Sequence, residues 1–205
     1  MEEKQPEKVI TAWFGELDSE GNVSVEIRNK WFNATADHDS ELRITFESWV
    51  FAAENGALKH WEESAEGRLA LIILLDQIPR NIYRSTACAY KYDAAALHHA
   101  KQALLKGQHK QLPYLMRIFC YMPFEHAECL LEQEQAVRLF KEVTSEVEAS
   151  SPLYSQLYAF YDYAVQHQKI IRQFGRFPHR NRTLGRISTP EETIYLEEKG
   201  TNFGQ

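Results

Sequence analysis

Apolar residues along this chain recur mostly at the three- and four-residue spacing of one face of an α-helix. No stretch of convincing length alternates at the two-residue spacing of a strand. A first helix is predicted from Pro6 to a stop at Gly15. A turn-rich connector follows over residues 18–25, and a second helix is predicted over 39–54, closed by Gly56.

The most apolar segment runs from Arg68 to Pro79 and is apolar on every side. A helix of this kind belongs in the middle of a bundle, although a buried strand has a similar pattern. The helical segments on both sides favour a helix. Because proline lacks an N–H and disfavours the helical conformation of the residue before it, this helix is expected to end at about Ile78.

The second half of the chain continues the helical pattern. Asp93 is expected to cap a helix that stops at Gly107, and another begins near Leu115 and breaks at Pro123. Three more are predicted from their caps and breakers: one from Pro123 to about Ala149, one from Ser151-Pro152 to Gly175, and one from the capping box Thr189-Pro190-Glu191-Glu192 to Gly200.

These elements predict a single all-α domain over residues 1–205, built as a bundle of about eight helices joined mostly by short loops. No linker divides the sequence in two. Paired helices of similar length are compatible with a repeat-like packing of helical hairpins.

Composition narrows the classes of partner. Of the 205 residues, 44% are hydrophobic and 25% charged, as in ordinary soluble domains. The formal net charge of -6 argues against nucleic acid or an anionic membrane as a partner, because phosphate binding depends on Lys and Arg. No apolar run approaches the roughly 18 residues of a membrane span. The polar N-terminus lacks the apolar core of a signal peptide. The cysteines are odd in number, Cys88, Cys120 and Cys129, and form no C-x-x-C pair. A cytoplasmic protein is therefore predicted.

Polar residues gather first at the end of the apolar segment. Asp76 follows a run of apolar residues and is expected to be buried, so it needs a hydrogen-bonding or charged partner. Arg80, Arg176 and Arg180 are the candidates, and Gln77 and Asn81 add amides beside them. Both a structural ion-pair network and a functional pocket fit this pattern.

A second polar group follows Pro123. If this proline opens a helix, Glu125 lies in its first turn, where the helix dipole favours an anion. Glu125 and Glu128 then share a face, while His126 points about 100° away. Glu125 and His126 are the candidate acid–base residues. A metal site that combines His126, His179 and a carboxylate is an alternative, although no zinc or di-iron spacing is present.

A third group, residues 174–186, carries four arginines, one histidine and no acid. Planar guanidinium groups suit carboxylate or phosphate, so Arg80, Arg176 or Arg180 is expected to hold an anion, with His179 and Asn181 nearby. In the alternative interpretation Arg176 and Arg180 pair with Asp76, Glu125 or Glu128, and Arg182 and Arg186 are solvated.

Three functions remain open at this point. The first is a small-molecule-binding protein, or an enzyme of unknown reaction, that holds an anionic ligand in a pocket at helix ends. The second is a helical adaptor that binds a protein segment through Tyr154, Tyr158 and Tyr161. The third is metal-assisted hydrolysis. No cofactor is identifiable. The candidate pocket comprises Asp76, Gln77, Arg80, Asn81, Glu125, His126, Glu128, Arg176, His179, Arg180 and Asn181.

The same three groups carry a family resemblance. Asp-Gln-Ile-Pro-Arg-Asn at 76–81, Pro-Phe-Glu-His-x-Glu at 123–128 and Gly-Arg-Phe-Pro-His-Arg-Asn at 175–181 resemble, in order and spacing, the motifs of the family called domain of unknown function 924. The resemblance covers nearly the whole chain. It implies an all-α, tetratricopeptide-like fold in a soluble, mostly bacterial protein, and it implies no mechanism.

Overall fold

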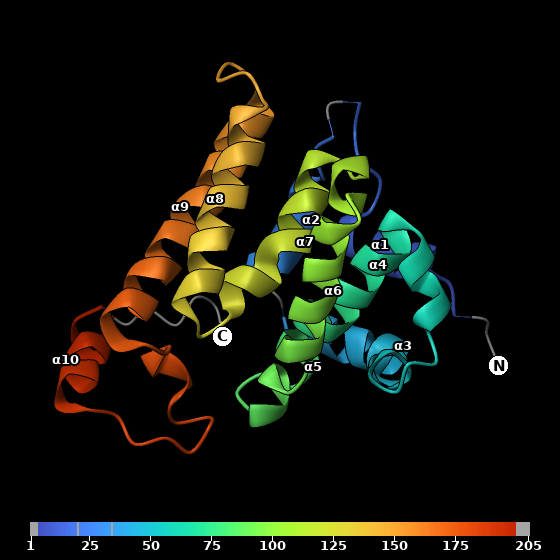
Figure 1. Cartoon of the computed structure of the whole chain (residues 1–205). Helices are drawn as coiled ribbons and strands as arrows, with labels where there is room; N and C mark the ends of the chain where they lie inside the picture. The colour runs from blue at the N-terminus through green and yellow to red at the C-terminus, as the bar shows by residue number, and fades with distance from the viewer. Residues whose placement is uncertain (1–3, 20, 34, 200–205) are drawn as a thin grey trace.

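The computed structural model describes residues 4–19, 21–33 and 35–199, and this part of the chain is helical without a strand (Figure 1). The α-helices are α1 Pro6–Phe14, α2 Val25–Phe32, α3 Ala36–Glu54, α4 Ala65–Ile72, α5 Ile78–Ile82, α6 Asp93–Leu105, α7 Tyr114–His126, α8 Leu130–Ser145, α9 Pro152–Phe174 and α10 Pro190–Lys199. The predicted all-α class is confirmed. Tetratricopeptide-like packing and a single domain stay predictions.

Both ends of α9 and the start of α10 lie where the sequence predicts them. The Ser151 side chain accepts a hydrogen bond from the Leu153 N–H at the start of α9, and Gly175 closes this helix at φ 70°. At α10, Thr189 and Glu192 form the reciprocal bonds of a capping box. Gly200 lies outside the described residues.

The apolar segment continues through Pro79, so the expected end at Ile78 is wrong. A π-helical turn over Ile73–Gln77 joins α4 to α5, and the three form one continuous helical rod. The π turn ends at Gln77 and α5 begins at Ile78, so Pro79 lies in the first turn of α5, where the missing N–H of a proline matters least. As a result Asp76 lies inside the rod and is fully buried.

The break predicted at Pro123 is also wrong, because α7 runs through this proline to His126. Every residue from Leu115 to His126 is buried, and this packing offsets the hydrogen bond that proline removes. Helix α8 begins only at Leu130 and ends at Ser145, short of the predicted Ala149. Glu125 therefore lies in a last turn, where the dipole disfavours a carboxylate, and not in a first turn.

Helix α2 is absent from the sequence prediction. None of its residues is fully buried, and only Ile27 and Trp31, both half-buried, pack against the core. Its start is marked only by Ser24, which accepts a hydrogen bond from the Ile27 N–H. Helix α3 begins at Ala36, three residues earlier than predicted, with Thr35 as its cap.

The hydrophobic core forms two clusters. The large one extends from Val9 in α1 to Ala164 in α9. The small one joins Ile170, Ile171 and Phe177 beneath α10. In Figure 1 the α8–α9 hairpin leans away from the other helices, and the chain after α9 turns back towards α5. The buried polar residues described below fill the junction of the two clusters. No described helix is long and apolar enough to cross a membrane.

Candidate functional site

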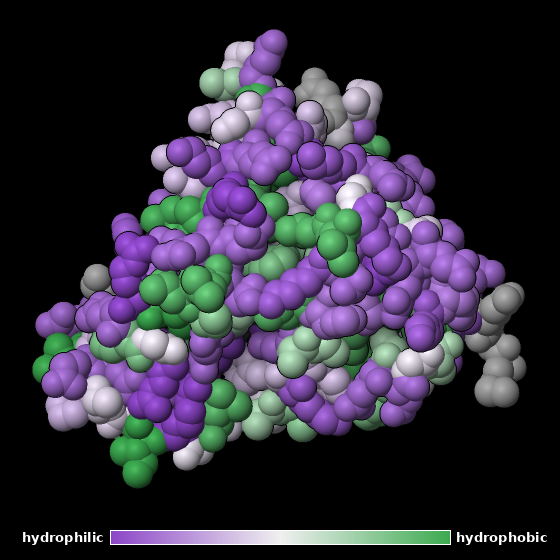
Figure 2. Space-filling model, viewed as in Figure 1, coloured by the Kyte–Doolittle hydropathy of each residue, from purple (hydrophilic) through white to green (hydrophobic). Residues whose placement is uncertain are grey.

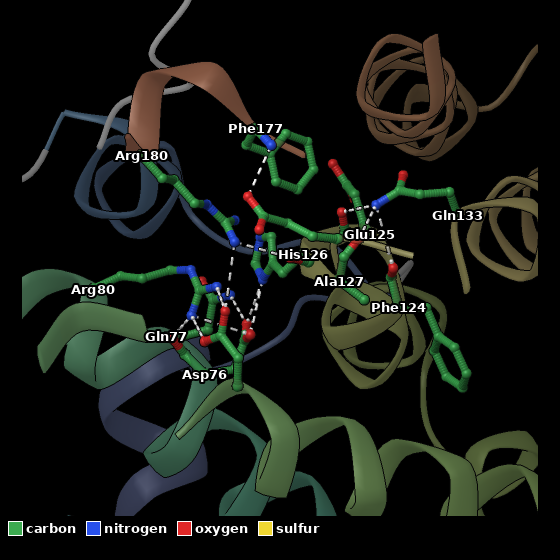
Figure 3. A network of polar contacts seen from close by, with 12 residues as sticks. Asp76, Gln77, Arg80, Phe124, Glu125, His126, Ala127, Gln133, Phe177 and Arg180 are labelled. Atoms are coloured by element: carbon green, nitrogen blue, oxygen red, sulfur yellow. Dashed lines mark hydrogen bonds and ion pairs between the residues drawn. The ribbon is translucent and has the colours of Figure 1, made fainter. Parts of the chain in front are cut away.

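Asp76 is at the centre of the buried polar network (Figure 3). Its carboxylate accepts hydrogen bonds from His126 Nδ1 at 2.8 and 3.0 Å and from Gln77 Nε2 at 2.5 Å. Arg80 Nη1 lies 3.2 Å from Oδ1. Burial alone raises the pKa of Asp76, but Arg80 and His126 outweigh burial and hold it below the ordinary value. The carboxylate is thus ionised and its hydrogen bonds are satisfied. Of the three arginines predicted as its partners, Arg80 contacts it, whereas Arg176 and Arg180 bind other residues.

Arg80 is shared between two carboxylates. Its Nη1 and Nη2 bind both oxygens of Asp93 at 2.9 Å, in addition to the contact with Asp76. The cap predicted for Asp93 is wrong: Tyr92 occupies the N-cap position, and the Asp93 side chain faces Arg80 instead. Burial lowers the pKa of Arg80, but the two aspartates outweigh burial and raise it. Arg80 is therefore firmly neutralised.

Arg180 lies above this pair and is 3% exposed. The rings of Phe177 and Tyr90 cover its guanidinium at 4.4 and 4.7 Å from the ring centroids. Its Nη1 donates to the backbone oxygen of His126 at 3.0 Å and lies 3.7 Å from Asp93. Its Nε and Nη2 are buried and have no hydrogen-bond partner among the described residues. Burial and the neighbouring Arg80 lower the pKa of Arg180 to about 10.

His126 forms a carboxylate–histidine dyad with Asp76. Because Nδ1 faces the carboxylate, it carries the proton, and Nε2 is left as the nitrogen that can accept one. Burial and Arg80 lower the pKa of His126, and Asp76 only partly offsets them. The imidazole is therefore neutral near pH 7 and suited to act as a base.

The lowered pKa of His126 predicts a pH dependence of stability. As pH falls below about 6.5, the unfolded chain binds a proton at this residue before the folded protein does. We expect the free energy of unfolding to fall as pH decreases from about 7 to about 5, measured by urea unfolding. Burial also lowers the pKa of His99, to about 4, and contributes to the same decrease.

The variant His126→Gln isolates the share of His126, because His99 is unchanged in it. Its free energy of unfolding should decrease less with acidification than that of the wild type. Equal decreases in the two proteins would contradict the assignment.

A second dyad lies beside the first. Glu125 Oε1 is 3.0 Å from His167 Nδ1, and both side chains are buried. The rings of His126 and His167 are 6.5 Å apart, and Phe177 packs against His167. His167 is not among the residues predicted for the site, because on α9 it has the spacing of an ordinary core position. Glu125 is committed to this pair and is a weaker candidate base than His126.

Glu128 anchors the segment that carries Arg180. Its carboxylate binds Arg186 at 2.5 and 2.9 Å and accepts the Phe177 N–H at 2.8 Å. The prediction that Arg186 is solvated is therefore wrong, because its guanidinium binds the Glu128 carboxylate. Burial raises the pKa of Glu128, but these contacts outweigh burial and lower it.

Arg176 and Asn181 point the other way, towards α10. Arg176 Nε and Nη2 bind the two oxygens of Glu192 at 2.6 and 2.8 Å. Asn181 donates to Ser188 and Glu192 and accepts from Arg186. Through these bonds both residues order the 175–192 segment, and their role in ligand binding stays a prediction. His179 is half-buried and packs on Phe177.

The comparisons with known proteins agree with this fold. Residues 9–200 match a protein family described as bacterial protein of unknown function, DUF924. The chain belongs to this family. The resemblance carried by the three motifs is thereby confirmed.

A solved structure of a protein of unknown function from Agrobacterium tumefaciens is similar to this DUF924 chain. The two share 35% sequence identity at a TM-score of 0.78, over 94% of this chain and 97% of the other. No curated protein matches the sequence. The family and the similar solved structure thus establish the fold and name no ligand.

Two alternative functions of this DUF924 protein stay predictions. Of the three proposed anchors for a protein segment, Tyr158 is 50% exposed and stacks on Tyr154, whereas Tyr154 and Tyr161 are half-buried. For the metal hypothesis, no three His, Cys, Asp or Glu side chains within residues 4–19, 21–33 and 35–199 are placed to hold an ion. His126 and His179 therefore gain no third ligand from this geometry.

Proposed function

We propose that this protein binds a small carboxylate- or phosphate-bearing molecule through Arg180. The observation that carries the proposal is the buried Nε and Nη2 pair of Arg180, two donors without a partner in the described part of the chain. Buried polar groups are nearly always hydrogen-bonded, and a buried cation with unused donors is costly. An anion at this position would satisfy both donors.

The geometry of the two donors favours an anion with a pair of oxygens. In this chain, Arg176 and Arg84 each use Nε and Nη2 to grip both oxygens of a carboxylate, Glu192 and Asp39 respectively. Arg180 presents the same edge of its guanidinium, while Tyr90 and Phe177 cover its faces. Recognition along the edge is therefore the mode left to it.

Electrostatics support the same assignment. Arg80 is neutralised by two aspartates, whereas Arg180 has Asp93 only at 3.7 Å, and its pKa is lowered to about 10. An anionic ligand would compensate this charge. Arg80 Nε and Asn81 Nδ2 are further buried donors without a described partner, and both belong to the motif that continues from Asp76.

His126 is the acid–base group that the site offers. Its backbone oxygen binds Arg180 and its ring is oriented by Asp76, so a ligand held by Arg180 would lie beside this histidine. Nε2 would accept a proton from the ligand, as in other carboxylate-oriented histidines. Gln77 holds Asp76 in place and is a positioning residue.

The test is thermal unfolding of the full chain with a panel of carboxylates, phosphates and nucleotides. A ligand at 100 times its dissociation constant adds about 2.7 kcal/mol and should raise the unfolding midpoint by roughly 5–10 °C. Arg180→Lys keeps the charge but loses the two-donor edge, and its response should disappear. Arg84→Lys is the matched control, since Arg84 forms its pair with Asp39 at the surface. A response equal in all three proteins would place the ligand away from Arg180.

A further inference from the structure

The charges around Arg180 limit the negative charge that a ligand can bring. Arg180 belongs to the segment between α9 and α10, whose surface is mainly hydrophilic at the lower left of Figure 2. The same network contains two further arginines and three carboxylates: Arg80, Arg186, Asp76, Asp93 and Glu128. With His126 neutral, the three positive and three negative charges balance, so the network as a whole has no surplus of positive charge.

Of these three arginines, Arg180 is the least compensated. Both end nitrogens of Arg80 bind Asp93, and Arg186 binds both oxygens of Glu128. Arg180 has a carboxylate only at 3.7 Å. One negative charge at its free edge would complete its compensation. A second negative charge would face Asp93 and Glu128, with no further uncompensated arginine in this network to offset it.

The helix ends near Arg180 do not favour a second charge either. Helix α7 ends at His126, whose backbone oxygen accepts a hydrogen bond from Arg180, so the negative end of this helix dipole faces the site. Helix α6 begins at Asp93, and this carboxylate already occupies the position that the positive end of its dipole favours.

The rings beside the guanidinium favour a planar group. Phe177 and Tyr90 lie over it at 4.4 and 4.7 Å. A carboxylate in the guanidinium plane places its two oxygens on Nε and Nη2, as Glu192 does on Arg176. A tetrahedral phosphate carries further oxygens outside this plane, on the sides where the aromatic rings lie and offer no ordinary hydrogen bond.

We propose that the ligand of Arg180 is a monocarboxylate and not a phosphate monoester, which rests on the proposed function and narrows it to one class of anion. Arg80 Nε is a further buried donor, but two aspartates neutralise Arg80, so this nitrogen adds a hydrogen bond and no uncompensated charge. It suits a neutral oxygen of the same ligand, such as a hydroxyl or a carbonyl.

Three probes that share a methyl group separate charge from shape. Acetate is a planar monoanion, methanesulfonate is a tetrahedral monoanion, and methyl phosphate is mostly a tetrahedral dianion at about pH 7.5. Their dissociation constants for the full chain are measured from amide NMR shifts at constant ionic strength. Acetate should bind at least about 10-fold more tightly than methyl phosphate, with methanesulfonate between them.

Asp93→Asn tests the charge count directly. It removes a negative charge beside Arg180, so methyl phosphate should bind several-fold more tightly relative to acetate than it does in the wild type. Asp39→Asn is the matched control, since Asp39 pairs with Arg84 at the surface, and its ratio of dissociation constants should equal that of the wild type. Circular dichroism verifies that each variant is folded.

Arg180→Lys separates failure of the monocarboxylate assignment from failure of the anion site. If methyl phosphate binds the wild type as tightly as acetate and both are lost in Arg180→Lys, the monocarboxylate is overturned and the anion site stands. If none of the probes binds, or if Arg180→Lys binds them as the wild type does, both are overturned.

Discussion

Asp76→Asn is expected to lower the free energy of unfolding by about 3–5 kcal/mol at pH 7. The substitution keeps the shape of the side chain but removes the charge that faces Arg80 and His126 at the fully buried position. Breaking one side of a buried ion pair is costly because it leaves the other charge uncompensated. Against a typical total of 5–15 kcal/mol this is a large fraction, and urea unfolding at pH 7 measures it.

The control is Glu26→Gln at the surface. Glu26 pairs with Lys30 one helical turn away at 2.8 Å, and its side chain is 78% exposed. Water screens this pair, so no measurable change in stability is expected. If Asp76→Asn were as mild as the control, the buried network would not be the electrostatic centre of the fold.

Arg180→Met should not destabilise the protein as Asp76→Asn does. Removing a buried and poorly compensated cation relieves its desolvation, so stability should be unchanged or higher, by up to about 2 kcal/mol. Asp93 keeps its two bonds to Arg80, and the methionine keeps apolar contact with Phe177 and Tyr90. The thermal response to any anion that the wild type binds should be lost.

This pair of outcomes separates a ligand site from a scaffold. If Arg180 serves only the fold, the variant should lose several kcal/mol and keep any response to anions. A residue whose removal abolishes binding without loss of stability has been retained for the ligand. Urea unfolding and the anion panel, applied to the same preparation of Arg180→Met, decide between the two.

The parts of the fold that are predictable from the sequence are those encoded locally. Ser151 and the Thr189–Glu192 box cap helices through contacts within three residues, so their pattern is visible in the chain. Pro79 and Pro123 predict breaks because proline disfavours a helix interior, but a π turn before Pro79 and the complete burial of α7 around Pro123 override this local preference. Helix α2 buries no residue completely, and Ile27 and Trp31 are too few to mark an apolar face in so short a helix.

The same distinction applies to the site. The partnership of Asp76 with Arg80 was predictable, since four residues along a helix bring side chains together. Asp93, Tyr90 and His167 enter only through tertiary contacts, and each has an ordinary local explanation as a helix start or a core position. No local signal distinguishes them. The unused edge of Arg180 depends on which carboxylates the other arginines occupy, and this is a property of the whole fold.

The π turn over Ile73–Gln77 has a consequence for the length of the rod. Its hydrogen bond runs from the Ile78 N–H to the Ile73 oxygen, so this turn holds one residue more than an α turn while covering about the same rotation and rise. A residue deleted from this turn would therefore leave a regular α-helix in which α4 and α5 keep nearly the same relative phase, and Arg80 would still face Asp93. The same deletion inside α4 would rotate everything after it by about 100° and shift it by about 1.5 Å. The rod is thus less sensitive to a change of chain length at the π turn than elsewhere along it.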